Sequence, residues 1–255
     1  MAEQAADPVL DITDLTHRYG DLQVLAGVTL RVQRGEFVSI VGPSGSGKST
    51  LFHLIGGLVT AESGTIALAG EPVAGRRGLV GYMPQQPALL PWRTIEENVV
   101  LARDIAGAPR RASRELARQW LDRVGLGRFA RSYPHELSGG MQQRAAFLRA
   151  LICDHDLICL DEPFSALDAM LRTEMHRWLL DLWEAERRSI LFVTHSIEEA
   201  LLLSDTVYVL TRRPATVAER VEVPFPRPRR DEVVDDPEFV RIRRRLTDLL
   251  RNETS

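Results

Sequence analysis

Residues 37–50 read FVSIVGPSGSGKST, and they give the strongest indication of the fold. The apolar run over residues 37–41 predicts a buried strand, and the pattern G-x-x-x-x-G-K-S follows it directly, from Gly42 to Ser49. Glycines let consecutive backbone N–H groups turn toward an anion, and the positive end of the helix predicted to start near Lys48 points at the same place. The stretch therefore predicts a phosphate-binding loop between a strand and a helix.

The basic residues of the chain single out one position in this loop. Lys48 is the only lysine, so 31 of the 32 basic residues are arginines. The compact ammonium of Lys48 is expected to bind the β- and γ-phosphates of a nucleotide, and the Ser49 hydroxyl is expected to coordinate Mg²⁺. The same count excludes a P-loop GTPase, whose guanine-reading motif needs a second lysine. The residues expected to bind the phosphates are Gly42, Pro43, Ser44, Gly45, Ser46, Gly47, Lys48, Ser49 and Thr50.

Composition and charge indicate an ordinary globular protein. The chain has 255 residues, of which 44% are hydrophobic, and its formal net charge is -3, which disfavours a nucleic-acid binder. Cys153 and Cys159 lie in or beside an apolar run, as is typical of reduced core thiols in the cytosol. Charges interrupt every apolar stretch well before the roughly 18 residues of a membrane helix. The start of the chain also lacks the charged segment and following apolar segment of a secretion signal. We therefore expect a protein that neither crosses a membrane nor is secreted.

Apolar strand-like runs alternate with helical patterns along most of the chain, which predicts an α/β fold with a largely parallel, doubly covered sheet. Helical periodicity with proline breaks replaces the strands over about residues 87–150, so we expect a helical subdomain inserted there. Residues 1–230 are expected to form one nucleotide-binding domain, and residues 231–255 a short C-terminal helical extension. That extension contains one polar helix, which is either a solvated surface helix or a docking element.

A second apolar strand, over residues 157–160, ends in two carboxylates, Asp161 and Glu162. A carboxylate at the carboxyl end of a strand beside a phosphate loop can hold the Mg²⁺ shell, which is the role expected of Asp161. Glu162 can then reach an attacking water. By itself, the pair is equally consistent with a solvated acidic turn.

Three further motifs lie around this strand. LSGGMQQR (residues 137–144) precedes it, SALD (residues 165–168) follows it, and His195 comes after the next apolar run. Their order and spacing resemble the ATP-binding cassette (ABC) family over about residues 9–223. The resemblance implies a P-loop NTPase core of ABC type, with an N-terminal antiparallel β subdomain and an inserted helical subdomain, that binds ATP with Mg²⁺ and hydrolyses the ATP.

The LSGG motif suggests a second anion site. Ser138 is expected to cap the helix that follows, so that Ser138, Gly139 and Gly140 present N–H donors. In the family, this segment of one subunit covers the ATP held by the phosphate loop of the other, so the resemblance implies a dimer. Without the neighbouring motifs, an ordinary capped helix would be the better interpretation.

The resemblance also assigns roles to single residues. Tyr19 is similar to the aromatic residue that stacks on adenine, and Gln85 to the glutamine that bridges Mg²⁺, water and the transmembrane partner; the adjacent Gln86 is the alternative. His195 resembles the histidine that senses the γ-phosphate, and Asp168, which ends the SALD motif, is counted with the nucleotide-binding residues. The expected catalytic residues are Glu162, His195 and Gln85, and the expected Mg²⁺ ligands are Ser49, Gln85 and Asp161.

One residue and three segments resemble the corresponding positions in the nitrate, sulfonate and taurine import branch of the family. They are Met141, QQPALLPW (residues 85–92), PRPR (226–229) and PEF (237–239). The chain is therefore expected to be the ATP-hydrolysing subunit of an importer of a small solute such as nitrate, a sulfonate or taurine. The implied partners are a second copy of the chain, two transmembrane permease subunits and, indirectly, an extracytoplasmic solute-binding protein, with no nucleic acid. The implied location is the cytoplasmic face of the inner (plasma) membrane, as a peripheral subunit.

Two other functions fit the sequence less well. Soluble ABC ATPases that act on ribosomes or DNA have tandem cassettes or long coiled-coil insertions, whereas this chain has one cassette and no heptad run. A catalytically silent binding module is disfavoured by the intact pair Asp161 and Glu162.

Leu89, Leu90 and Trp92 form an apolar cluster just after Gln85, in a proline-bracketed segment where a loop is expected. Such residues either belong to the core or line a groove on the surface. Apolar and aromatic anchors beside a phosphate-sensing loop are what an interface requires. We therefore expect a groove that accepts a short helix of the permease.

Overall fold

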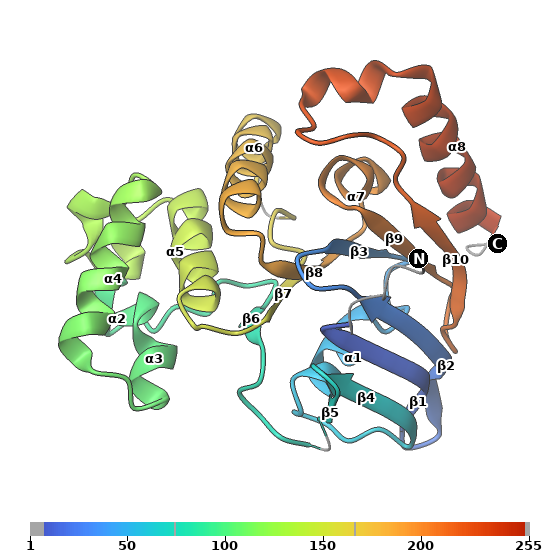
Figure 1. The fold of residues 1–255 in the computed structure, drawn as a ribbon, viewed down its shortest axis with the longest axis horizontal. Coiled ribbons are helices and arrows are strands. Elements are labelled where there is room, and N and C mark those ends of the chain that lie inside the picture. Colours follow the sequence, from blue (N-terminus) through green and yellow to red (C-terminus); the bar gives the residue numbers. More distant parts are fainter. Residues whose placement is uncertain (1–7, 74, 166, 253–255) are drawn as a thin grey trace, which may run out of the picture.

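Two β-sheets organise the part of the chain that the computed structural model describes, which is residues 8–73, 75–165 and 167–252. One sheet has six strands in the order β10-β9-β3-β8-β7-β6, and the other has four in the order β2-β1-β4-β5. Figure 1 shows the larger sheet in the middle of the molecule, with a group of helices at one end. The predicted α/β class, with an antiparallel N-terminal sheet and inserted helices, is confirmed.

The six-stranded sheet is parallel except at one edge, where β10 runs antiparallel to β9. Every residue of β3, β7, β8 and β9 is buried, as expected for parallel strands that are covered on both faces. Parallel pairing brings the carboxyl ends of β6, β7, β8 and β3 to one edge of the sheet, where the candidate site forms. The strands are β3 (Phe37–Val41), β6 (Gly81–Met83), β7 (Leu157–Asp161), β8 (Ser189–Thr194), β9 (Thr206–Leu210) and β10 (Val217–Glu222).

The four-stranded sheet pairs antiparallel throughout. Its apolar residues share one core with residues from one face of the larger sheet. Helix α1 (Lys48–Ile55) packs with both sheets, because Leu51 of this helix joins one apolar core with Ile12 of β1 and Ile40 of β3. The strands of the smaller sheet are β1 (Leu10–Tyr19), β2 (Leu22–Val32), β4 (Ser63–Leu68) and β5 (Glu71–Pro72).

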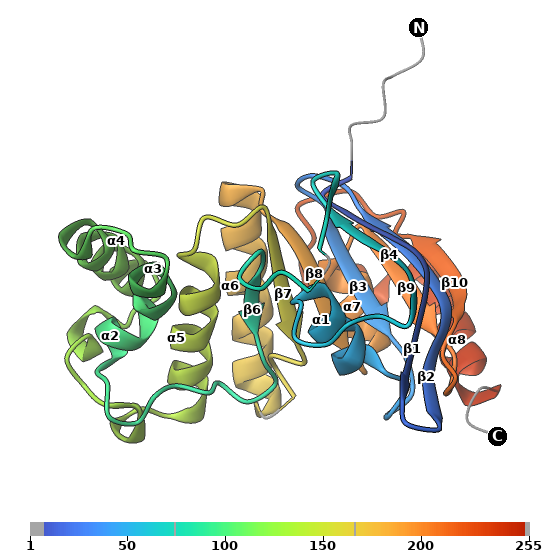
Figure 2. The same cartoon turned by 90° about the horizontal axis from the view of Figure 1, so that it is seen from below.

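The helices between β6 and β7 gather at one end of the molecule in both views (Figures 1 and 2). Thr94 starts α2 through a capping box with Glu97, whose carboxylate accepts from the Thr94 N–H at 3.0 Å. A buried stripe that includes Trp120 and Leu121 packs α4 on the core shared with β7 and α6. These elements are α2 (Ile95–Val99), α3 (Leu101–Ile105), α4 (Arg110–Arg123), η1 (Gly127–Phe129), η2 (Pro134–Glu136) and α5 (Gly139–Leu151).

Three helices cover the other face of the larger sheet: α6 (Ala169–Glu186), α7 (Ile197–Leu203) and α8 (Pro237–Asn252), the last preceded by η3 (Asp231–Asp235). Helix α8 is not the solvated surface helix that its polar sequence allowed. Phe239, Ile242 and Leu246 are buried and join Val41 and Val209 in one core. These residues recur at i, i+3 and i+7, so they share one face of a helix whose other positions are mostly charged. No helix among the described residues has the length and apolar character needed to cross a bilayer.

Candidate functional site

The loop between β3 and α1 places the predicted phosphate-binding residues at the carboxyl edge of the larger sheet. Gly45 and Gly47 have positive φ angles of 76° and 102°, and Gly47 directly precedes the helix. A Cβ atom on Gly47 would lie 2.7 Å from Cγ1 of Val24 in β2, which is closer than such atoms can approach. Glycine is therefore required at this position by both the turn and the close approach of β2.

Lys48 begins α1, and its side chain folds back into the loop. The Nζ atom donates to the carbonyl oxygens of Gly42 at 2.9 Å and Pro43 at 3.0 Å. Burial lowers the pKa of Lys48, and the negative charges of Glu162 and Asp161 act in the opposite direction. The ammonium is thus held in the loop, within the field of Asp161 at the end of β7 and Glu162 directly after it.

Asp161 is the last residue of β7. Its carboxylate forms a hydrogen bond with Ser49, the predicted metal ligand in the phosphate-binding loop. Burial is the largest influence on Asp161 and raises its pKa, while a hydrogen bond with the Ser49 hydroxyl acts against it. Mg²⁺ prefers oxygen ligands and usually takes one or two from the protein, with the rest from water and substrate phosphates. Ser49 and Asp161 supply two such oxygens, so they fit an ion that is shared between the protein and a bound phosphate.

Glu162 lies between two of the residues predicted to act with it. Its Oε2 accepts a hydrogen bond from Gln85 Nε2 at 3.2 Å and lies 3.3 Å from His195 Nδ1. Gln85 follows β6, Glu162 follows β7 and His195 follows β8, so three neighbouring parallel strands bring them together. The backbone of Glu162 is left-handed, with φ 44°, and its N–H donates to Val193 of β8 at 2.9 Å. Such a conformation costs on the order of 1–3 kcal/mol, and the bond to β8 helps to hold it.

The segment Ser138–Gly140 stands at the start of α5. Ser138 caps this helix as predicted, accepting from the Met141 N–H at 3.4 Å. A Cβ atom on Gly140 would lie 2.4 Å from Leu171 Cδ2, whereas one on Gly139 would meet nothing within 4 Å. Both views separate α5 from α1 by β6 and β7 (Figures 1 and 2). Within one chain, the structure therefore does not bring this segment to the phosphate-binding loop.

Asp168 and Tyr19 make other contacts within the single chain. Asp168 is exposed and caps α6, accepting from the Leu171 N–H at 3.0 Å. Tyr19 is 46% exposed at the end of β1, and its ring packs edge to face on His17 with centroids 4.7 Å apart. Both predicted nucleotide-binding residues therefore lie at the surface.

Trp92 is 70% exposed, whereas Leu89 and Leu90 are half-buried and Leu89 packs against the core. The loop that carries them is held by Asn98, which is fully buried. Asn98 Oδ1 accepts from the Leu90 N–H at 2.7 Å, and Nδ2 donates to three carbonyl oxygens of the loop at 3.1, 3.1 and 3.0 Å. The predicted cluster is therefore divided, with Leu89 turned to the core and Trp92 to the surface.

Two polar groups that support the site were missed by the sequence analysis. Arg149 of α5 donates to the carbonyl oxygens of Pro87 at 2.8 Å and Ala88 at 2.7 Å, and so holds the segment after Gln85. Glu199 of α7 accepts from the hydroxyl of Thr194, the residue before His195, at 2.6 Å. Each stands within or directly before an apolar run, and that position is the signal that could have marked them as buried.

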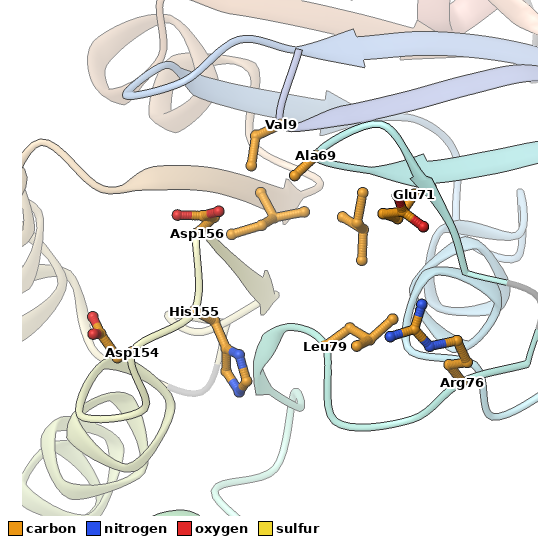
Figure 3. A pocket seen from close by; sticks show the side chains of 10 residues that line it. Val9, Ala69, Glu71, Arg76, Leu79, Asp154, His155 and Asp156 are labelled. Carbon is orange, nitrogen blue, oxygen red and sulfur yellow. The ribbon is translucent and has the colours of Figure 1, made fainter. Parts of the chain in front are cut away.

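A cavity of about 310 Å³ opens beside Leu157, at the start of β7 (Figure 3). The candidate site lies at the other end of that strand. Two carboxylates on the rim of the cavity are already paired, Asp154 with Arg188 at 2.9 Å and Asp156 with Arg34 at 3.2 Å. The cavity is therefore separated from the candidate site by the length of β7 and takes no part in it.

Sequence comparison finds one matching family model and relatives that are named as import ATP-binding proteins. The ABC transporter family model matches residues 25–165. The nitrate import ATP-binding protein of Synechocystis is 39% identical over 252 residues, covering 95% of each chain. An aliphatic sulfonates import ATP-binding protein of Burkholderia lata is 42% identical and covers 97% of this chain and 88% of its own. The formylaminopyrimidine import ATP-binding protein of Halalkalibacterium halodurans is 47% identical, covering 79% of this chain and 78% of its own.

Solved structures of ABC transporter cassettes share the fold. The dimeric bacterial cassette MJ0796 superposes with a TM-score of 0.74 and 30% identity, covering 85% of this chain and 100% of its own. A dimeric post-hydrolysis state of the same cassette, bound to ADP and phosphate, gives a TM-score of 0.73 and 29% identity with the same coverage.

Proposed function

This chain belongs to the ABC transporter family, and from that premise we propose that it is the ATP-hydrolysing subunit of an importer. As a member of the family it is an ATPase coupled to transport, and the solute passes through separate permease subunits. The observation that carries the proposal is the meeting of Gln85, Glu162 and His195 at the sheet edge that also carries the phosphate-binding loop.

The loop of residues 42–50 binds the triphosphate of ATP, because its backbone N–H groups and the start of α1 face an anion. Lys48, already held in the loop, exchanges the carbonyl oxygens of Gly42 and Pro43 for oxygens of the β- and γ-phosphates. Ser49, Asp161 and Gln85 would hold Mg²⁺, which when bound would neutralise charge on the phosphates. Tyr19, exposed at the end of β1, stacks on the adenine.

Glu162 orients the attacking water and accepts its proton as the new oxygen–phosphorus bond forms and the bond to ADP breaks. Gln85 donates to the Glu162 carboxylate and so aligns it. Lys48 and His195 stabilise the negative charge that spreads over the γ-phosphate. The chain therefore acts by positioning and electrostatics rather than by forming a covalent bond to the substrate.

A second copy of the chain completes the site. The N-terminus of α5 presents backbone N–H groups at Ser138–Gly140, and the space around Gly139 is open. We assign these residues and Asp168 of one copy to the ATP held by residues 42–50 of the other. The dimers formed by the related cassettes support this arrangement.

The exposed face around Trp92 receives a short helix of a permease subunit, because a large exposed aromatic side chain is a typical interface anchor. The import names of the relatives favour a small solute such as nitrate, a sulfonate or taurine over an ABC ATPase that acts on ribosomes or DNA. Two permease subunits and a solute-binding protein complete the proposed importer, with this subunit on the cytoplasmic face of the inner membrane.

Glu162→Gln tests this function. The substitution keeps the shape of the side chain and removes the carboxylate that accepts the proton, so we expect Mg·ATP binding to persist while kcat falls about 10²–10⁴-fold. ATP should then hold two copies together in size-exclusion chromatography. Glu62→Gln, which changes an exposed carboxylate, is the control and should match the wild type. Undiminished turnover, with a Glu162→Gln protein that stays monomeric in ATP, would contradict both the base and the dimer.

A further inference from the structure

Glu199 lies in the first turn of α7, and only 7% of this residue is exposed to solvent. Its Oε2 accepts from the Thr194 hydroxyl at 2.6 Å, and its Oε1 lies 3.3 Å from His176 Nε2 and 3.7 Å from Arg172 Nε. Burial alone would raise the pKa of Glu199, but the bonds from His176 and Thr194 and the charge of Arg172 outweigh it and hold the pKa below its usual range. Glu199 is thus a buried anion with partners on two other elements, β8 and α6.

The contacts of Glu199 lie on both sides of His195 along the chain. Thr194, which donates to the carboxylate, also accepts from the Ser196 N–H at 3.0 Å. Ser196 in turn accepts from the Glu199 N–H at 3.2 Å. The residues directly before and after His195 are therefore both tied to Glu199, while the His195 side chain itself is 60% exposed.

The two partners of Glu199 on helix α6, Arg172 and His176, are held in place by further contacts. The Arg172 side chain that approaches the carboxylate also donates to the Leu167 carbonyl oxygen at 3.0 Å. The ring of His176 packs edge to face on Phe164, with centroids 5.0 Å apart. Because both partners of Glu199 are anchored in this way, the carboxylate has little freedom to move.

We propose that Glu199 is a positioning residue for ATP hydrolysis, which holds Thr194 and Ser196 and thereby sets His195 against Glu162. It does not reach the reacting atoms. The inference rests on the role proposed for His195 above. Its consequence is that loss of the Glu199 charge lowers the rate of the chemical step without weakening the binding of ATP, since the phosphate-binding loop is untouched.

Glu199→Gln and its neighbour Glu198→Gln form a matched pair. Both remove one negative charge from the first turn of α7, but Glu198 is exposed and pairs with Arg243 of α8 at 2.7 Å. Steady-state ATPase assays over a range of ATP concentrations should give a kcat about tenfold lower for Glu199→Gln, with KM within about twofold of the wild type. Glu198→Gln should retain both values. Equal kcat in the two variants, or a loss carried by KM alone, would overturn the proposal.

A double-mutant cycle with His195→Ala tests whether Glu199 acts through His195. If it does, Glu199→Gln should lower kcat no further in the His195→Ala background. Losses that multiply would show that Glu199 acts elsewhere and would overturn the proposal, leaving the role of His195 intact. An unchanged kcat in His195→Ala alone would overturn the role proposed for His195 and, with it, the role of Glu199.

Thr194 provides a second route if Glu199→Gln fails to fold, as judged by circular dichroism. Thr194→Val keeps the shape of the side chain and removes the hydroxyl that links Glu199 to Ser196. It should lower kcat, whereas Thr194→Ser, which keeps the hydroxyl, should restore most of it. Equal turnover in the valine and serine variants would overturn the proposal.

Discussion

Asn98→Ala should lower the free energy of unfolding of the isolated subunit by about 2–4 kcal/mol. Asn98 is fully buried, and its amide accepts from the Leu90 N–H and donates to the carbonyl oxygens of Leu90, Arg93 and Thr94. Each hydrogen bond is worth about 0.5–1.5 kcal/mol net. The loop is partly exposed, so water recovers some of the loss, and we take the lower part of the sum.

Urea unfolding followed by circular dichroism measures this difference. In a chain of 255 residues, the expected loss corresponds to a fall of roughly 4–16 °C in Tm. Asn98→Asp is the matched variant, because it keeps the acceptor for the Leu90 N–H but replaces the donor nitrogen with an anionic oxygen. That oxygen would face three carbonyl oxygens in a buried site, so Asn98→Asp should lose at least as much stability as Asn98→Ala.

Two results would contradict the role given to Asn98. A loss below about 0.5 kcal/mol in Asn98→Ala would equal that of an ordinary surface substitution, and the amide would then not hold the loop that carries Trp92. Wild-type stability in Asn98→Asp would show that the bonds donated by the amide nitrogen contribute nothing.

Two further substitutions test residues singled out by the sequence. Lys48→Arg should lose ATP binding or turnover although the charge remains, because a planar guanidinium cannot replace a point charge held by carbonyl oxygens at 2.9 and 3.0 Å; ATP titration and steady-state assays check this, and wild-type values in both would remove the role given to Lys48. Trp92→Ala should change stability by less than about 1 kcal/mol because the side chain is 70% exposed, and should keep the isolated ATPase activity while weakening assembly or transport in reconstituted vesicles. A large loss of Tm with normal permease binding would instead assign Trp92 to the core.

The sequence was enough to locate the phosphate-binding loop and the pair Asp161 and Glu162 at the end of β7. Both could be located because each is specified by a short, continuous stretch of residues. A glycine pattern after one apolar run, and two carboxylates after another, each occupy a short stretch of chain. The conformation of the loop follows from the same stretch, since Gly45 and Gly47 take up the positive φ angles that other residues avoid.

The contacts of the polar groups that support the site could not be predicted in this way, because their partners are distant along the chain. Arg149 bonds to a segment about 60 residues earlier, and Glu199 meets His176 of another helix, 23 residues away. A neighbouring apolar run can mark such a charged side chain as buried, but the groups that Glu199 meets depend on the packing of α6 against α7. In α8, Phe239, Ile242 and Leu246 form a buried apolar stripe. This stripe is hard to recognise in the sequence because many arginines lie between and around these residues.

The amino-acid sequence was enough to predict the alternation of strands and helices, the loop around Lys48, and the two carboxylates at the end of an apolar strand. The folded chain was needed to see that Gln85 and His195, 77 and 33 residues from Glu162, meet its carboxylate, and that Ser138–Gly140 stay apart from the loop of their own chain. This difference arises because a local pattern specifies the backbone of one element, whereas side chains from different elements meet only through the order and register of the strands. In this fold, the neighbouring places of β6, β7 and β8 in the sheet supply that order.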